Sequence, residues 1–100
     1  MKYGKLVRDR IPYIIREKGR HSKTHVAGDV EYWEKLLEKL SEEVDEFREG
    51  GNPEELADIL EVIKAICKFK GLNEKEVESI RKKKAEERGG FEERIILDET

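Results

Sequence analysis

The chain has 100 residues, of which 45% are charged and only 36% are hydrophobic, with a net charge of −3. This length fits one domain over residues 1–100 with a small core, and the charge offers no long-range attraction to nucleic acid or an anionic membrane. No apolar stretch reaches the roughly 20 residues of a membrane span. The N-terminal "MKYGKLVRDR" lacks the apolar segment of a secretion signal, so we expect a cytoplasmic protein.

The first predicted element is a short helix within "DRIPYIIREKG", with Pro12 in its opening turn and Gly19 at its end. The polar segment after it predicts at most a brief strand around Thr24 to Val26. A long amphipathic helix is expected from about Val30 to Glu49, with Asp29 as its N-cap. Its apolar stripe recurs at spacings of three and four and comprises Trp33, Leu36, Leu37, Leu40, Val44 and Phe47.

The next helix is predicted to begin with Asn52 as its cap and Pro53 in its first position, after the break "REGG". Its apolar side runs from Leu56 to Phe69 and covers about half of the circumference. A face this broad has more to bury than one neighbouring helix can cover, which favours a homo-oligomer, either a dimer or a tetramer. Cys67, the single cysteine, belongs to this face and is expected in the core.

A third long helix carries a full start signal, with Asn73 as cap and Glu76 three residues later, and it ends at Gly89. The final "FEERIILDE" predicts a short strand that could pair with the Thr24 region. The expected fold is therefore all-α. It is an antiparallel bundle of three long helices plus a short N-terminal helix, with a minor β appendage.

Acidic residues on two of these helices are predicted to point toward a shared interface. At 100° per residue, Glu43 lies about 80° from the centre of its apolar stripe and Glu46 about 140°, on the same flank. Glu55 lies about 40° from the centre of the next helix's apolar face and Asp58 about 100°, while Glu42 points outward. Four such carboxylates need positive charge between them, and a hard divalent cation such as Mg²⁺ can supply it.

A plainer interpretation stays open at this point. Nineteen residues are Glu, so acidic pairs at helical spacing also arise on ordinary solvated faces. Lys39 could form a surface ion pair with Glu43, four residues on. Glu55 could complete a capping box with Asn52.

On the third helix, the apolar positions Val77 and Ile80 are continued on one face by Arg81, Lys84 and Arg88. This stripe could neutralise the acids directly, or it could grip the phosphates of a metal-bound ligand. Trp33 could stack on a base, but its place within the apolar stripe favours core packing. His21 and His25 are treated as surface residues.

The acidic pattern also resembles a known signature. "EEVDE" (residues 42–46) followed by "ELAD" (residues 55–58) resembles the EExxE…ExxD motif of the MazG-like all-α nucleoside triphosphate pyrophosphohydrolases. "KLVRDRIP", "EELADILEVIKAI" and "IRKKKAEERGGFEERIIL" are similar to the small single-domain branch described as phosphoribosyl-ATP pyrophosphohydrolase-like, so the resemblance covers nearly the whole chain. One departure is that only eight residues separate Glu46 from Glu55, fewer than in many members.

The resemblance implies that Mg²⁺, with Mn²⁺ as an alternative, is bound by Glu43, Glu46, Glu55 and Asp58. It implies hydrolysis of a nucleotide between its α- and β-phosphates, which yields a nucleoside monophosphate and pyrophosphate. Glu46, with Glu43, is the candidate for accepting the proton of the attacking water. The candidates for holding the substrate are Arg81, Lys84, Arg88 and Arg8. Lys5, Arg8 and Asp9 also resemble a motif of the family, but its role is not evident from their chemistry. Asp9 could simply cap the first helix.

The substrate is left open between noncanonical or surplus nucleoside triphosphates and phosphoribosyl-ATP. An alternative function is a non-catalytic helical module that oligomerises, regulates and binds nucleotides without cutting them. Nucleic-acid binding through "RKKK" is disfavoured because the overall charge is negative and no aromatic residues alternate with the bases.

Overall fold

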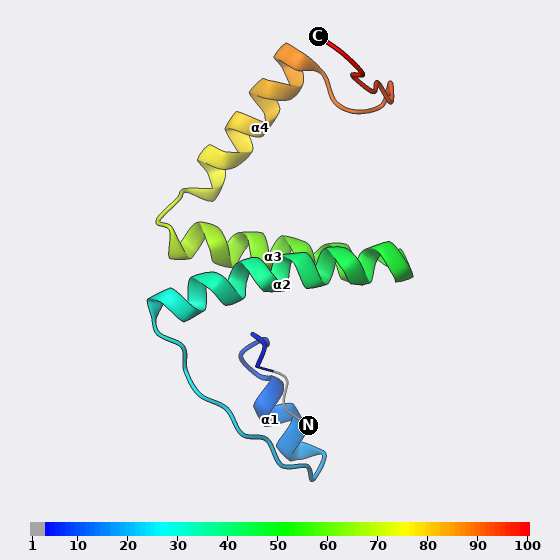
Figure 1. Cartoon of the computed structure of the whole chain (residues 1–100). Helices are drawn as coiled ribbons and strands as arrows, with labels where there is room; N and C mark the ends of the chain where they lie inside the picture. The colour runs from blue at the N-terminus through cyan, green and yellow to red at the C-terminus, as the bar shows by residue number, and fades with distance from the viewer. Residues whose placement is uncertain (1–3) are drawn as a thin grey trace.

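A computed structural model describes residues 4–100, and this part of the chain is all-helical. Figure 1 shows four helices in chain order, which are α1 (Ile11–Glu17), α2 (Asp29–Gly50), α3 (Pro53–Phe69) and α4 (Glu74–Arg88). The all-α prediction is confirmed, and each helix begins and ends within two residues of its predicted position. None of these helices is long and apolar enough to cross a bilayer.

The predicted strands are wrong for the described residues. Thr24–Val26 and the segment 91–99 contain no strand, and they lie at opposite ends of the molecule (Figure 1). A strand is stable only when a neighbouring strand pairs with its backbone groups at a spacing of about 4.8 Å. No strand among residues 4–100 is available to pair with the apolar segment Ile95, Ile96 and Leu97, and all three side chains are exposed.

Helices α2 and α3 form an antiparallel hairpin, and no other two helices within residues 4–100 share more than marginal contact. The turn depends on Gly51, which adopts the left-handed conformation with φ +66° and donates its N–H to the Phe47 carbonyl at 2.8 Å. Pro53 then begins α3 with a backbone angle already suited to a helix. A two-residue connection therefore places the end of α2 beside the start of α3.

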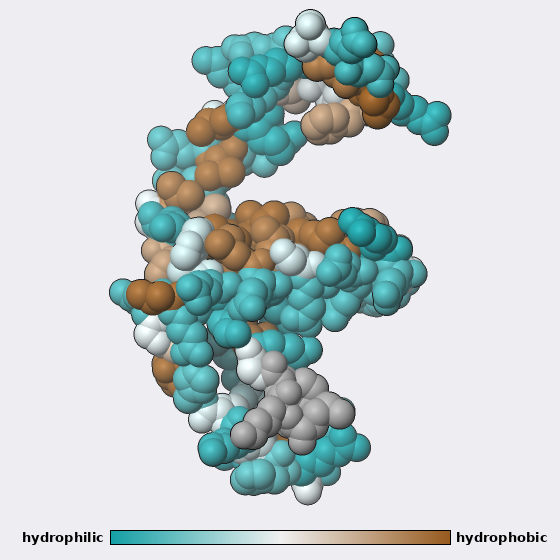
Figure 2. Space-filling model, viewed as in Figure 1, coloured by the Kyte–Doolittle hydropathy of each residue, from teal (hydrophilic) through white to brown (hydrophobic). Residues whose placement is uncertain are grey.

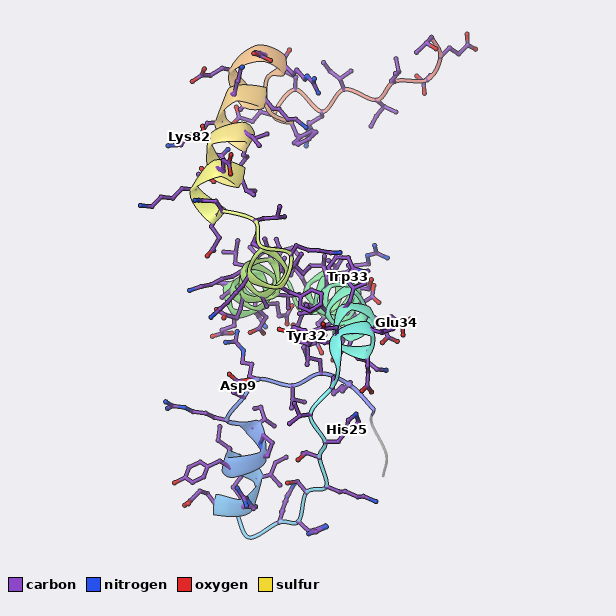
Figure 3. All side chains as sticks on the ribbon, turned by 90° about the vertical axis from the view of Figure 1, so that its left-hand side faces the viewer. Asp9, His25, Tyr32, Trp33, Glu34 and Lys82 are labelled. Carbon is purple, nitrogen blue, oxygen red and sulfur yellow. The ribbon has the colours of Figure 1, made fainter. Side chains whose placement is uncertain are left out.

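The core of the hairpin is small. Leu36 on α2 is 1% exposed, and it is joined in the core by Val62 and Cys67 of α3, which confirms the interior position of the cysteine. At the open end of the hairpin, the Phe69 ring stacks on Trp33 at 6.0 Å and meets the edge of Tyr32 at 5.2 Å (Figure 3). Trp33 thus packs between the helices, as its place in the apolar stripe predicted.

Helix α4 rises away from the hairpin, so a three-helix bundle does not form within one chain (Figure 1). Every residue from Lys70 to Thr100 is exposed. The predicted inward face of α4 is therefore wrong for the single chain. The helix itself is well specified locally, because Asn73 caps it by accepting the N–H groups of Lys75 and Glu76 at 2.8 and 3.3 Å.

Two other capping predictions differ by one residue. The N-cap positions are Arg10 for α1 and Gly28 for α2, where Asp9 and Asp29 had been expected. Gly28 is extended, with ψ −179°, and leads directly into the helix. Asp29 instead lies in the first turn, where its negative charge favours the positive end of the helix dipole.

Truncating the buried leucine should test the hairpin core. We expect Leu36→Ala to lower the free energy of unfolding by about 2–5 kcal/mol, because a fully buried side chain leaves a cavity between α2 and α3. Urea denaturation followed by circular dichroism measures this change. The exposed Val26→Ala should change stability by less than about 0.5 kcal/mol, and equal losses in the two variants would contradict this core assignment.

Candidate metal centre

Three acidic side chains of α2 lie close together, one of them buried between α2 and α3 and two nearer the solvent. Glu42, Glu43 and Glu46 each offer a carboxylate oxygen, and these oxygens lie within 4.8 Å of one another. The helix brings them together because residues one turn apart, such as Glu42 and Glu46, lie above each other on its surface. The spacing suits a single small cation bound by several oxygen ligands.

Glu43 is the unusual member of this group because it is only 4% exposed. It lies two helical turns after Leu36 and faces α3 with it. Its Oε1 pairs with the Lys39 Nζ at 3.1 Å, but its Oε2 is buried and has no hydrogen-bond partner among residues 4–100. A buried carboxylate oxygen that no donor reaches is costly, and a bound cation would remove that cost.

Glu55 supplies a second unpartnered oxygen from the facing helix. Its Oε2 is buried and has no hydrogen-bond partner in the part of the chain that the structure describes. Its carboxylate lies against the α-carbon of Gly50, where a Cβ would collide with it. Glycine at the end of α2 thus leaves room for this carboxylate. The capping-box alternative is not observed, since the Asn52 side chain makes no capping hydrogen bond.

Cations of the N-terminal segment reach the acids from outside the hairpin. Arg8 donates to the Asp58 Oδ1 at 2.7 Å, and the Lys5 ammonium lies 3.1 Å from the Glu42 Oε1. Residues 4–10 therefore contact both α2 and α3 on the side away from α4 (Figure 1). These contacts give the "KLVRDRIP" segment a physical role that the sequence did not reveal.

The neighbouring acids raise the pKa of the Glu46 carboxyl above its ordinary value. The largest cause is a hydrogen bond that a protonated Glu46 can share with Glu43, followed by the negative charge of Glu43 itself. Slight desolvation and the charge of Glu42 also raise this pKa, while the charge of Lys39 lowers it. When both carboxylates are ionised there is no donor between them, in agreement with the unpartnered Oε2 of Glu43.

The four predicted metal ligands are only partly brought together. Glu43 and Glu46 share one cluster, whereas Glu55 and Asp58 lie on the facing helix outside the group that meets within 4.8 Å. Glu42 belongs to the cluster although the helical projection pointed it outward. A projection follows the Cβ direction, but a glutamate side chain can bend back toward a neighbour one turn away. The first position of the EExxE motif was the available signal for Glu42.

The predicted phosphate-binding cations of α4 lie elsewhere in this chain. Arg81, Lys84 and Arg88 are exposed on a helix that does not pack on the hairpin. Arg81 makes a forked ion pair with Glu78 of its own helix, with N–O distances of 2.7–3.1 Å. This pairing lowers the pKa of Glu78. A role of these three cations in holding a substrate stays a prediction.

The outer face of α2 beside the cluster is strongly acidic. An open hollow of about 570 Å³ there is lined by Glu38, Ser41, Glu42, Asp45, Glu46 and Glu49. Phosphate groups would be repelled by this surface unless cations neutralised it. His25, on a loop near the start of α2, is exposed and pairs with Glu31 at 3.0 Å, which agrees with its surface assignment.

Comparison with known proteins finds a bacterial relative that matches part of the chain. The chain is 52% identical over 45 residues to an uncharacterised protein of Mycolicibacterium smegmatis. The match covers 45% of this chain and 46% of that protein, so the chain spans about half of its relative's length. No family model and no solved structure matches the chain.

Titration of Glu46 should report the coupling within the cluster. In the absence of divalent cations, we expect its carboxyl pKa, measured by carbon NMR, to lie above 4.5 and to fall in Glu43→Gln, which removes the neighbouring charge. Because the folded-state value is raised, the stability from this group is full below the unfolded pKa and is lost as pH rises through the folded value. An unchanged Glu46 titration in Glu43→Gln would contradict this coupling.

Proposed function

We propose that the chain is a Mg²⁺-dependent nucleotide pyrophosphohydrolase of the MazG-like type. The observation that carries this proposal is the pair of buried, unpartnered carboxylate oxygens of Glu43 and Glu55, on two helices that face each other. Carboxylates buried in this way would favour a small, hard divalent cation with oxygen ligands, either Mg²⁺ or Mn²⁺. The resemblance of the EExxE…ExxD pattern supports the same assignment.

In this proposal Glu43 and Glu55 hold the metal from the seam, and Glu42 and Glu46 hold it from the solvent side. Asp58 would be a further ligand, and Arg8, which pairs with it, would be placed to contact the substrate. Bound Mg²⁺ would polarise the phosphates and lower the pKa of water at the site. Glu46, which is exposed beside the cluster, would accept the proton of the attacking water as the bond between the α- and β-phosphates breaks.

The cations around the acids have a matching role. Lys5 and Arg8 each pair with one of the acids, and Lys39 pairs with both Glu42 and Glu43. These cations lie where they could balance the charge that develops on the leaving pyrophosphate. Arg81, Lys84 and Arg88 would assist only if α4 of some chain approached the cluster. Two substrate classes stay open. One is a noncanonical or surplus nucleoside triphosphate, and the other is phosphoribosyl-ATP. No residue of the site that would read the base chooses between them.

A second candidate is a non-catalytic helical module that binds nucleotides. It is favoured by the ion pairs of Lys39, Lys5 and Arg8, which already neutralise part of the cluster without any metal. The two candidates differ in turnover. An enzyme releases pyrophosphate from its nucleotide, whereas a regulatory module binds the nucleotide unchanged.

Pyrophosphate release from a panel of nucleotides, with and without Mg²⁺, tests the enzyme. We expect activity only with the metal, and a loss of at least about 100-fold in Glu43→Gln and in Asp58→Asn, because removing a direct ligand should cost at least as much as removing a group that supports one. Glu34→Gln is the matched control, since Glu34 is an exposed α2 residue that points away from α3 (Figure 3). Full activity in both site variants would remove the assignment.

Thermal unfolding tests the cation site separately from catalysis. Mg²⁺ at about 100 times its dissociation constant should stabilise the fold by about 2.7 kcal/mol, because it binds the assembled acids and not the unfolded chain. Differential scanning calorimetry should show this increase in the wild type and not in Glu43→Gln. An equal increase from NaCl at matched ionic strength would instead indicate general screening of the acids.

A further inference from the structure

The N-terminal arm, residues 4–28, meets the hairpin through exposed charged side chains and not through an apolar core. No residue of this arm is buried, and of residues 4–10 only Leu6 is partly buried. The side of α2 and α3 that faces α1 is hydrophilic (Figure 2), so it offers the arm little apolar surface. Exposed ion pairs contribute little to stability, and a competing ion can therefore replace them.

Two ion pairs place residues 4–10 across the seam between α2 and α3, and we call these residues the strap. The Lys5 Nζ lies 3.1 Å from the Glu42 Oε1 on α2. The Arg8 Nη2 lies 2.7 Å from the Asp58 Oδ1 on α3. The strap therefore spans both helices of the hairpin, next to the acids of the proposed metal site.

Space remains between the strap and α2. A hollow of about 220 Å³ there is lined by residues 4–6 of the strap and by Lys35, Glu38, Lys39 and Glu42 of α2. This volume has room for several water molecules, and polar groups surround it. The strap thus covers the acids without packing tightly on them, and a small hydrated cation can reach Glu42 past it.

The cations of the strap and a divalent cation would compete for the same carboxylates. Glu42 pairs with the strap, and one of its oxygens also lies within 4.8 Å of an oxygen of Glu43 and of Glu46. The strap does not satisfy this cluster, because Glu43 is only 4% exposed and its Oε2 has no hydrogen-bond partner among residues 4–100. A metal ion about 2.1 Å from a Glu42 oxygen would lie close to the ammonium group on the same carboxylate, and the two like charges would repel each other.

We propose that the strap is a removable internal counter-ion: when a divalent cation binds the acids, the ion pairs of Lys5 and Arg8 break and the strap detaches from the hairpin. This inference rests on the proposed function, because it takes the acid cluster as a cation site. The coupling is reciprocal, so the strap weakens metal binding by the same factor by which the metal weakens the strap. The detached cations are then available to an anionic substrate at the same site.

Calorimetric titration with MgCl₂ alone tests the competition. The double variant Lys5→Gln/Arg8→Gln should bind Mg²⁺ at least about fivefold more tightly than the wild type, since coupled binding events usually differ by this factor or more. Arg10→Gln/Arg16→Gln is the matched control, because it removes two charges from exposed residues of the same arm that make no ion pair within residues 4–100. In ~0.15 M salt it should change the affinity by less than about twofold. Equal tightening in both variants would indicate a general effect of net charge and would overturn the proposal.

Nuclear magnetic resonance of the wild type reports the strap directly. The heteronuclear NOE values of residues 4–10 should fall as Mg²⁺ saturates the site, because a detached segment gains fast motion. In Glu43→Gln the strap should stay ordered in Mg²⁺, because this variant lacks a ligand of the cation site and keeps both ion pairs. If Mg²⁺ binds the wild type but the strap is equally ordered or equally mobile with and without it, this proposal is overturned and the cation site stands. If Mg²⁺ binds none of these proteins, the proposed function is overturned, and this inference with it.

Discussion

A carboxylate in the seam between α2 and α3 imposes the constraint around which the rest of the site is arranged. Glu43 follows Leu36 by two turns and faces the same neighbouring helix, where an apolar residue would pack without electrostatic cost. Lys39 partners one of its oxygens and leaves the other without a donor. Glu55 on the facing helix also has a buried oxygen, Oε2, that no donor among the described residues reaches. Such positions reduce the stability of a small core, and the cation site proposed here would offset that cost.

The hairpin has two sides of opposite character, and the tight turn at Gly51 produces both. Because the connection is so short, α2 and α3 align along their full lengths, and the wide apolar side of α3 extends beyond what α2 covers. The acidic residues then gather on the other side, where Lys5 and Arg8 of the N-terminal segment contact them. The proposed cation site therefore lies on the side of the hairpin away from its exposed apolar residues (Figure 2).

Local features of the fold were predictable because they depend on residues close together in sequence. Asn73 caps α4 and Pro53 opens α3 through hydrogen bonds and backbone angles within one turn. The burial of Cys67 and Glu43 also follows from helical periodicity. Glu42 was misplaced because a projection ignores the bending of a long side chain. The strands at Thr24 and Ile95 were wrong because a strand needs a distant partner that no local pattern can guarantee.

The sequence by itself determined the four helices, their ends, and the acidic character of the α2–α3 region, since helical hydrogen bonds and periodicity act over only a few residues. Only the tertiary structure decided that Glu43 and Glu55 have oxygens without partners, that Arg8 pairs with Asp58, and that α4 leaves the hairpin. These properties depend on which surfaces meet across many residues. Burial and unpaired charge arise from that contact between distant segments, and no single segment contains them.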